Sequence, residues 1–203
     1  MRVKDMFLKS EKYFFYLFII FLFVITCKVN ASSSEKNKAL NYLSSLKYFS
    51  ASFLQNDGKN LSEGKVYVGE KRVRAEYLSP TKILIILDEN KAMYYDYLLE
   101  EDEFFNPKNT NAWFFYDIFR DPYFFDDSLI KEKNNELILK KEGIDKLNKT
   151  FLIKVYFEQY PLTLRGIEVV FDEDFLRFSF YDHNYNEEFD KDFFKLINPK
   201  FFN

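Results

Sequence analysis

The first regular pattern of apolar and polar positions lies between Lys36 and Ser50. Apolar residues recur there at steps of three or four, at Ala39, Tyr42, Leu43, Leu46 and Phe49. This spacing places them on one face of a helix, because an α-helix has 3.6 residues per turn. We therefore predict an amphipathic helix over residues 36–50, with its apolar face packed against the rest of the protein.

Beyond this helix the apolar spacing changes to two, which predicts β-strands. Strand-like segments run over Glu63–Val68, Arg72–Tyr77, Lys82–Asp88, Ala92–Leu99, Glu136–Lys140, Phe151–Phe157, Leu162–Phe171 and Leu176–Phe180. The residues Ile83–Leu87 are apolar without alternation, so we expect them to be covered on both faces. The alternation shifts phase at Gly166, which predicts a β-bulge there.

A different pattern interrupts the strands in the middle of the chain. Asn111–Phe119 is apolar almost all round and follows Thr110, a residue type that caps helix N-termini. Arg120-Asp121-Pro122 ends this predicted short helix, and a second helical piece is predicted over Asp126–Lys133. A short apolar helix inserted between strands has to be buried, and the open mouth of a curved sheet offers the place.

These patterns together predict a mainly β protein with helices, of the α+β class. We expect one highly curved antiparallel sheet of about nine to eleven strands, since a sheet of this size curls toward a barrel. The N-terminal helix and the inserted helix complete this incomplete barrel. No repeat and no long linker divides residues 32–203, so we predict a single domain.

Residues 1–31 have the pattern of a secretory signal peptide. Basic residues precede an uncharged apolar run from Tyr13 to Thr26. As a helix this run would span about 21 Å, which is shorter than the ~30 Å hydrocarbon core of a bilayer. Val29-Asn30-Ala31 then resembles a signal peptidase site, so cleavage after Ala31 is predicted. An uncleaved inner-membrane anchor and a lipid attached at Cys27 are the alternatives.

Composition narrows the class of protein further. Of 203 residues, 47% are hydrophobic and 21% aromatic, which supplies enough apolar surface to exclude a disordered chain. The single cysteine excludes a disulfide scaffold, and with the single histidine it excludes a Cys/His metal site. The formal net charge of −3 gives no basic excess for nucleic-acid binding. We expect no cofactor, no metal and no nucleic acid.

Candidate catalytic groups are few. His183 lies in the polar segment Tyr181–Tyr185 without a nucleophile motif nearby, so we interpret it as an exposed turn residue. The carboxylate pairs Asp126-Asp127 and Glu187-Glu188 could in principle serve a glycosidase. Among 32 acidic residues, however, such pairs arise by chance and usually mark a solvated face. We predict no catalytic residue and no enzymatic activity.

Five segments of the chain, taken in order, resemble one known family. They are Phe49–Gln55, Glu63–Val68, Val73–Pro80, Ile85–Tyr95 and Asn109–Phe114. In order and spacing these segments are similar to the first strands and the lid helix of the periplasmic lipoprotein carrier family, LolA. The resemblance is clearest from Phe49 to Phe119.

This resemblance implies a half-barrel that encloses an apolar cavity for acyl chains under a helical lid. Members of the family accept lipoproteins released by an inner-membrane ABC transporter and carry them through the periplasm to the outer membrane. The implied partners are acylated lipoproteins, the lipoprotein-releasing ABC transporter, and an outer-membrane receptor or the outer membrane itself. We expect a monomer located in the periplasm.

The resemblance also implies which residues act in cargo binding. The expected lid residues are Trp113, Phe114, Ile118 and Phe119. The expected cavity-lining residues are Val66, Val68, Tyr77, Ile85 and Tyr95. Arg72 is the candidate for the family's lid-tethering arginine and Arg74 is the alternative, because the K-R-P motif that marks this position is absent. Ala75 replaces the usual aromatic residue, which would widen the cavity locally.

Two other functions fit the same predicted fold. A lipid-sensing regulatory module held at the inner membrane by an uncleaved N-terminus would share this sheet, since fold alone does not fix function. A carrier of other lipids would need the same cavity. The N-terminus of the mature chain separates a membrane-held module from a soluble carrier, which would begin at Ser32.

Overall fold

The computed structural model describes residues 33–146, 148–172 and 174–202. The predicted signal peptide lies outside these residues. Residues up to Lys38 form a unit separate from Ala39–Asn203, and the description below concerns the second unit. Within the described part of the chain, no helix is long and apolar enough to cross a membrane.

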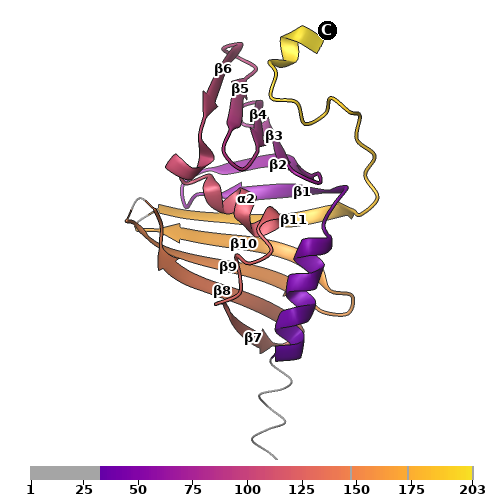
Figure 1. Cartoon of the computed structure of the whole chain (residues 1–203), viewed down its shortest axis with the longest axis vertical. Helices are drawn as coiled ribbons and strands as arrows, with labels where there is room; N and C mark the ends of the chain where they lie inside the picture. Colours follow the sequence, from indigo (N-terminus) through magenta and orange to yellow (C-terminus); the bar gives the residue numbers. More distant parts are fainter. Residues whose placement is uncertain (1–32, 147, 173, 203) are drawn as a thin grey trace, which may run out of the picture. The chain divides into compact units, whose positions relative to one another are not determined.

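One antiparallel sheet of eleven strands makes up most of the structure. The strands are β1 (Phe49–Asn56), β2 (Leu61–Val68), β3 (Val73–Ser79), β4 (Ile83–Leu87), β5 (Ala92–Asp96), β6 (Glu101–Phe105), β7 (Leu129–Lys133), β8 (Glu136–Ile144), β9 (Thr150–Glu158), β10 (Thr163–Phe171) and β11 (Asp174–Asn184). Their order is β6-β5-β4-β3-β2-β1-β11-β10-β9-β8-β7, so β6 and β7 form the two edges (Figure 1). The sheet is open, and the predicted incomplete barrel with helices is confirmed.

The helices of the described residues lie at three places along the chain. The first covers residues 33–45 and ends before the predicted Ser50, because Phe49 already begins β1. The second, α2 (Trp113–Arg120), follows the 3-10 helix η1 (Pro107–Asn109), and a further 3-10 helix, η2 (Pro199–Phe202), lies near the C-terminus. Figure 1 shows α2 lying against one face of the sheet, over its middle strands.

Two predictions of local structure are wrong. Asp126–Lys133 is not helical, since Leu129–Lys133 pairs with β8 as an edge strand. This pairing depends on a neighbouring strand that local sequence preference does not reveal. Thr110 is not the helix cap, because the N-cap position of α2 is Ala112. The Thr110 hydroxyl instead accepts a hydrogen bond of 3.2 Å from the Ala112 N–H, in the turn ahead of the helix.

The two faces of the sheet bury different clusters. The inner face, which lies beneath α2, carries the main core and includes Val66 and Val68. The outer face of β4 and β5 carries a smaller cluster of Leu84, Ile86, Met93 and Tyr95, against which Leu196 of the C-terminal segment packs. Successive strand residues point to opposite faces, so a strand covered on both sides needs apolar residues throughout. The two-sided covering predicted for Ile83–Leu87 is confirmed.

The predicted β-bulge at Gly166 is also confirmed. The register between β9 and β10 shifts between Leu164 and Gly166. A Cβ atom at Gly166 would lie 3.0 Å from the carbonyl oxygen of Phe178 on the neighbouring strand. A larger residue would therefore crowd β11 at the point where the chain bends.

Candidate functional site

Helix α2 is held on the inner face of the sheet by apolar packing. It buries Phe114, Phe115, Ile118 and Phe119 in the main core. The ring centroid of Phe115 lies 4.8 Å from that of Phe178 on β11, and those of Phe114 and Phe171 lie 5.7 Å apart. Aromatic side chains bury large apolar areas and gain further from such ring contacts. The apolar side chains of the predicted lid helix thus pack against the sheet and are shielded from solvent.

An apolar cavity of about 250 Å³ lies between the start of α2 and the inner face. It is lined by Gln55, Val73, Ala75, Tyr77, Ile85, Leu87, Asn111, Ala112, Phe114, Phe115, Leu176 and Phe178. The Tyr77 hydroxyl donates a 2.6 Å hydrogen bond to Gln55 Oε1, so these two polar groups satisfy each other. Burial raises the pKa of Tyr77 to about 12, which keeps its hydroxyl neutral. The cavity therefore offers an uncharged, mainly apolar surface.

The structure divides the predicted cavity residues into three sets. Tyr77 and Ile85 line the cavity. Val66 and Val68 face the same side but are fully buried in the core beside it. Tyr95 lies in the outer-face cluster, so the structure does not place it in the cavity. Tyr95 pairs with Leu84, and the side chains of a directly paired couple share a face, which here is the outer one.

The predicted lid residues do not all line the same pocket. Phe114 lines the apolar cavity, whereas Ile118 and Phe119 line a second pocket at the other end of α2. Trp113 packs edge-on against Phe151 at 5.2 Å between ring centroids. Its indole N–H is buried and has no hydrogen-bond partner among the described residues. All four side chains belong to α2, but only Phe114 contacts the cavity beneath it.

The arginines predicted to tether the lid bind the C-terminal segment instead. Arg72 pairs with Asp88, with 2.7 Å between Nε and Oδ2, and donates a 2.9 Å hydrogen bond to the Phe194 carbonyl. Arg74 donates a 2.5 Å hydrogen bond to the Phe193 carbonyl, and its guanidinium lies 4.2 Å from the Phe193 ring centroid. Among the described residues, neither arginine donates to α2. In particular, Arg74 points to the outer face, which is the wrong side of the sheet for that contact.

A different arginine connects α2 to the rest of the protein. Arg120, the last residue of α2, donates from Nη1 to the carbonyls of Gly69 (2.9 Å) and Glu70 (3.3 Å), and from Nη2 to the Leu46 carbonyl. It thus joins the helix to the β2–β3 turn and to the segment before β1. The sequence offered only a weak signal for this role, a basic residue in the last helical turn ahead of Asp121-Pro122.

Two charged groups of α2 are partly withdrawn from water. Burial raises the pKa of Asp117 to about 6, and the neighbouring Asp121 adds to the increase. Burial lowers the pKa of Arg120 to about 10. Both shifts disfavour the charged forms, as expected when ions lose solvation. Burial of these two groups therefore carries an electrostatic cost in the folded protein.

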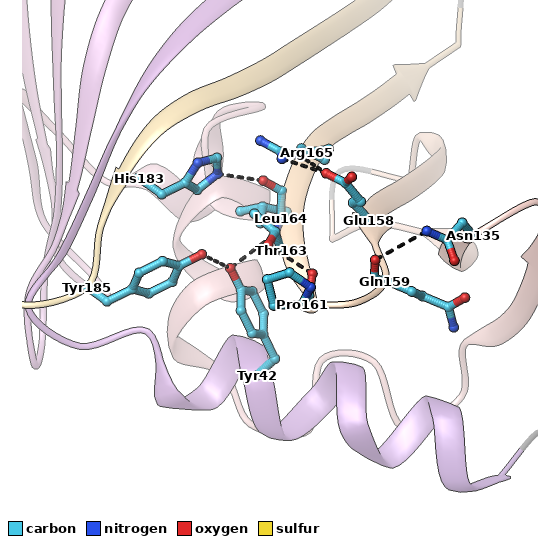
Figure 2. Close-up of polar contacts among 10 residues, drawn as sticks. All are labelled: Tyr42, Asn135, Glu158, Gln159, Pro161, Thr163, Leu164, Arg165, His183 and Tyr185. Carbon is cyan, nitrogen blue, oxygen red and sulfur yellow. Dashed lines mark hydrogen bonds and ion pairs between the residues drawn. The ribbon is translucent and has the colours of Figure 1, made fainter.

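A polar network attaches the N-terminal helix to the start of β10 and the end of β11 (Figure 2). The Tyr42 hydroxyl lies 2.8 Å from that of Tyr185 and accepts a 3.0 Å hydrogen bond from the Leu164 N–H. His183 Nε2 lies 2.7 Å from the Leu164 carbonyl oxygen, and burial lowers the pKa of this histidine. His183 is thus a half-buried residue at the end of β11, not an exposed turn residue. The imidazole also packs against the rings of Phe49 and Tyr185, so it connects the end of β11 with β1 and β10.

The chemistry available at the site is that of apolar binding. No group of three or more His, Cys, Asp or Glu side chains in the described residues could hold a metal ion. The cavity is lined by uncharged side chains. Such a site suits a ligand made of hydrocarbon, which requires enclosure rather than poised catalytic groups.

Solved structures with a similar fold share little sequence identity with this chain. An uncharacterized conserved protein from Thermus thermophilus is 11% identical with a TM-score of 0.50, over 80% of this chain and 96% of that one. MucB in the Pseudomonas aeruginosa MucA/MucB complex is 11% identical with a TM-score of 0.43, over 78% of this chain and 60% of that one. A search among curated proteins finds no match.

The sequence itself matches a protein family across most of its length. The model of the family described as outer membrane lipoprotein carrier protein LolA matches residues 44–197. This range includes every strand of the sheet, α2 with its cavity, and most of the C-terminal segment. The open antiparallel sheet, the apolar cavity and the covering helix agree with this match, and the chain belongs to the LolA family of outer membrane lipoprotein carrier proteins.

Proposed function

We propose that this protein is a periplasmic carrier that binds the acyl chains of lipoproteins released from the inner membrane and delivers them to the outer membrane. The observation that carries the proposal is the apolar cavity between α2 and the inner face of the sheet. Membership of the LolA family supports a carrier of lipoproteins rather than an enzyme. The signal-peptide pattern of residues 1–31 supports export, with a mature domain of residues 32–203.

Cargo binding depends on the exclusion of acyl chains from water. Each buried methylene contributes about 0.8 kcal/mol, so a lipoprotein anchor cannot be left exposed during transfer. A cavity of about 250 Å³ is small for several long chains, and the cavity would expand if α2 moved away from the sheet. Trp113, Phe114, Ile118 and Phe119 would then contact cargo in place of the core. We propose these four residues as the cargo-responsive lid.

The closed helix also sets how tightly cargo is held. Cargo must replace contacts such as those of Phe115 with Phe178, and this replacement lowers the net affinity for acyl chains. A moderate affinity lets the cargo pass on to the next acceptor. Arg120 holds the closed position through its bonds to backbone carbonyls, and we propose it as the residue that tethers the lid.

The test is binding of a triacylated lipopeptide to the mature chain beginning at Ser32. Trp113 is the only tryptophan, so its fluorescence reports directly on α2. Phe114→Asp places a charge in the cavity and should weaken lipopeptide binding at least about tenfold, because burying an unpaired charge is costly. Tyr123→Asp, at a side chain that is 74% exposed, is the matched control and should bind normally.

Two results would contradict the proposal. If Phe114→Asp abolished folding, as judged by circular dichroism and thermal melting, α2 would be a fixed part of the core rather than a lid. If the protein purified from periplasm under non-denaturing conditions retained residues 1–31 and carried no acylated lipoprotein, a membrane-held module would be the better interpretation. An N-terminus at Ser32 with co-purifying lipoprotein is the expected result.

A further inference from the structure

Three large apolar side chains are exposed together at one end of the fold. Leu98 and Leu99, in the turn between β5 and β6, are 80% and 64% exposed, and Phe201 of η2 is 81% exposed. An ion pair between Lys200 and Glu100 joins η2 to this turn, and Figure 1 shows both at the same end of the fold. Single exposed apolar residues are common, whereas a cluster of large ones is typical of an interaction site. We name Leu98, Leu99 and Phe201 the apolar tip.

A buried carboxylate fixes the turn that carries the two leucines. The Oδ1 atom of Asp96, a residue only 8% exposed, accepts hydrogen bonds from the N–H groups of Leu98 (2.7 Å) and Leu99 (3.1 Å). These two backbone donors are satisfied within the turn, while the leucine side chains remain outside. An unsatisfied N–H group opposes transfer of a segment into hydrocarbon. The turn can therefore enter an apolar medium without leaving these donors unpaired.

Amphipathic side chains lie next to the apolar tip. Tyr97 immediately precedes Leu98, and its N–H donates a 3.2 Å hydrogen bond to the Lys82 carbonyl. The Lys82 Nζ atom lies 4.4 Å from the centroid of the Tyr97 ring. Tyrosine and lysine are the residue types that place an apolar body at the edge of the hydrocarbon and a polar end among lipid headgroups. Their position beside the apolar tip therefore fits the change of polarity across a lipid surface.

The apolar tip lies at the end of the sheet that the proposed lipoprotein cavity approaches. Tyr77, which lines the cavity, pairs with Ile83, and Ile83 pairs with Asp96 at the start of the turn. Two strand spacings, about 10 Å, separate the first and last members of this row. A surface docked on the apolar tip would therefore lie close to the cavity.

We propose that the apolar tip docks this protein on a lipid bilayer, with Leu98, Leu99 and Phe201 in the hydrocarbon and Tyr97 and Lys82 among the headgroups. The inference rests on the proposed carrier function, since docking would bring the cavity beside a membrane that supplies or receives acyl chains. Three side chains bury too little apolar area for a permanent anchor. The contact is therefore reversible, as a carrier that has to leave the membrane again requires.

Charge should contribute little to this docking. Strand β6 carries Glu101, Asp102 and Glu103, whereas Lys82 and Lys200 are cations beside the turn. Anionic headgroups repel acidic side chains, so docking should be at least as tight on a neutral bilayer as on an anionic one. This expectation separates apolar docking from the salt-sensitive binding of basic surfaces to anionic lipid.

The experiment is flotation of the mature chain with vesicles of phosphatidylcholine alone and of phosphatidylethanolamine with phosphatidylglycerol. The wild-type protein should float with both, and added salt should change little. Leu98→Ser/Leu99→Ser should lower the partition coefficient at least about tenfold, because two large apolar side chains are lost from the contact. The matched control is Leu129→Ser/Ile144→Ser, at comparably exposed positions on β7 and β8 in the other half of the sheet. This control should float like the wild type.

Insertion itself can be measured with single fluorescent labels. The chain has one cysteine, Cys27, which lies in the predicted signal peptide, so a mature chain that begins at Ser32 has none. Leu99→Cys, labelled with an environment-sensitive dye, should gain fluorescence on vesicles and be protected from a water-soluble quencher. The same label on Ile144→Cys should remain accessible to the quencher.

Four results would overturn the docking proposal. They are a wild-type protein that floats with neither vesicle, two double variants that float equally well, binding that requires anionic lipid and is lost in salt, and equal protection of the two labels. Lipopeptide binding without vesicles, followed by Trp113 fluorescence, is a separate readout, and Leu98→Ser/Leu99→Ser should leave it unchanged. A wild-type protein that docks on vesicles but binds no lipopeptide would contradict the carrier function and leave the docking site in place.

Discussion

At the scale of single residues, the burial of Asp117 on α2 makes the stability of the protein depend on pH. Asp117 has an ordinary pKa of 3.8, which burial and the nearby Asp121 raise to about 6. Lys108 and Lys146 oppose the increase, and Glu89 adds to it. Between pH 3.8 and about 6 the folded protein therefore holds a proton that the unfolded chain has already released.

The sign of the pH dependence follows from this difference in bound protons. The contribution of Asp117 to stability should fall as pH rises from about 4 to 6, because in that range the unfolded chain binds fewer protons than the folded protein, and it should remain low at higher pH. Asp117→Asn should remove this decline, which urea unfolding at half-unit pH steps would detect. Asp174→Asn, at an exposed position, should keep the wild-type profile. Identical profiles for wild type and Asp117→Asn would contradict the prediction.

At the scale of the element, helix α2 could be predicted from the sequence, whereas its attachment to the rest of the protein could not. The apolar run Asn111–Phe119 and the following Pro122 were sufficient to indicate a short buried helix, and α2 spans Trp113–Arg120. Its attachment through Arg120 depends on carbonyls of Leu46, Gly69 and Glu70, which lie 50 to 74 residues earlier in the chain. Sequence periodicity does not report such long-range contacts.

Loss of the Arg120 contacts should loosen α2 more than the rest of the fold. Arg120→Gln removes hydrogen bonds from a charged donor to the partly buried carbonyls of Leu46 and Gly69, which should weaken the attachment of α2 by about 2–3 kcal/mol. Hydrogen exchange should show faster exchange in α2, with the central strands unchanged. Arg165→Gln, in an exposed ion pair with Glu158, is the control and should cost less than about 1 kcal/mol. Equal protection of α2 in both variants would exclude Arg120 as a tether.

At the scale of the whole described fold, the C-terminal segment completes the outer face of the sheet. Phe194 packs where Gly69 has no side chain, since a Cβ there would lie 2.7 Å from the Phe194 ring. Phe193 contacts Tyr67 on β2 at 4.9 Å between ring centroids, and Leu196 covers the outer cluster of β4 and β5. Strands that would otherwise expose apolar residues are thereby covered without a second sheet.

Removal of one of these contacts should lower global stability. Phe194→Ala should cost about 2–3 kcal/mol in the free energy of unfolding, because a large, partly buried aromatic side chain is lost from a fitted position. Phe201→Ala is the matched control, since that side chain is 81% exposed, and it should change stability by less than about 0.5 kcal/mol. Chemical denaturation of the three proteins measures both values. A Phe194→Ala variant as stable as the control would mean that the segment is not part of the cooperative fold.

Much of the fold could be predicted from local patterns, with particular exceptions. Alternation identified most strands, the continuous apolar run Ile83–Leu87 indicated covering on both faces, and Gly166 marked the bulge. The pattern missed the central strand β1 and the edge strand β6, whose sequence Glu101–Phe105 is mostly acidic and exposed, and it misread the edge strand β7 as helix. Edge strands bury little, so they impose no apolar alternation on the sequence.

The sequence by itself determined the fold class, the family and the short buried helix, because these depend on period, spacing and order along the chain. Only the tertiary structure decided which face each strand residue occupies and which arginine serves each contact. Tyr95 lies on the outer face through its pairing with Leu84, and Arg72 contacts the C-terminal segment while Arg120 contacts the turn beside α2. These outcomes depend on strand register and on contacts between distant segments, which a one-dimensional pattern does not contain.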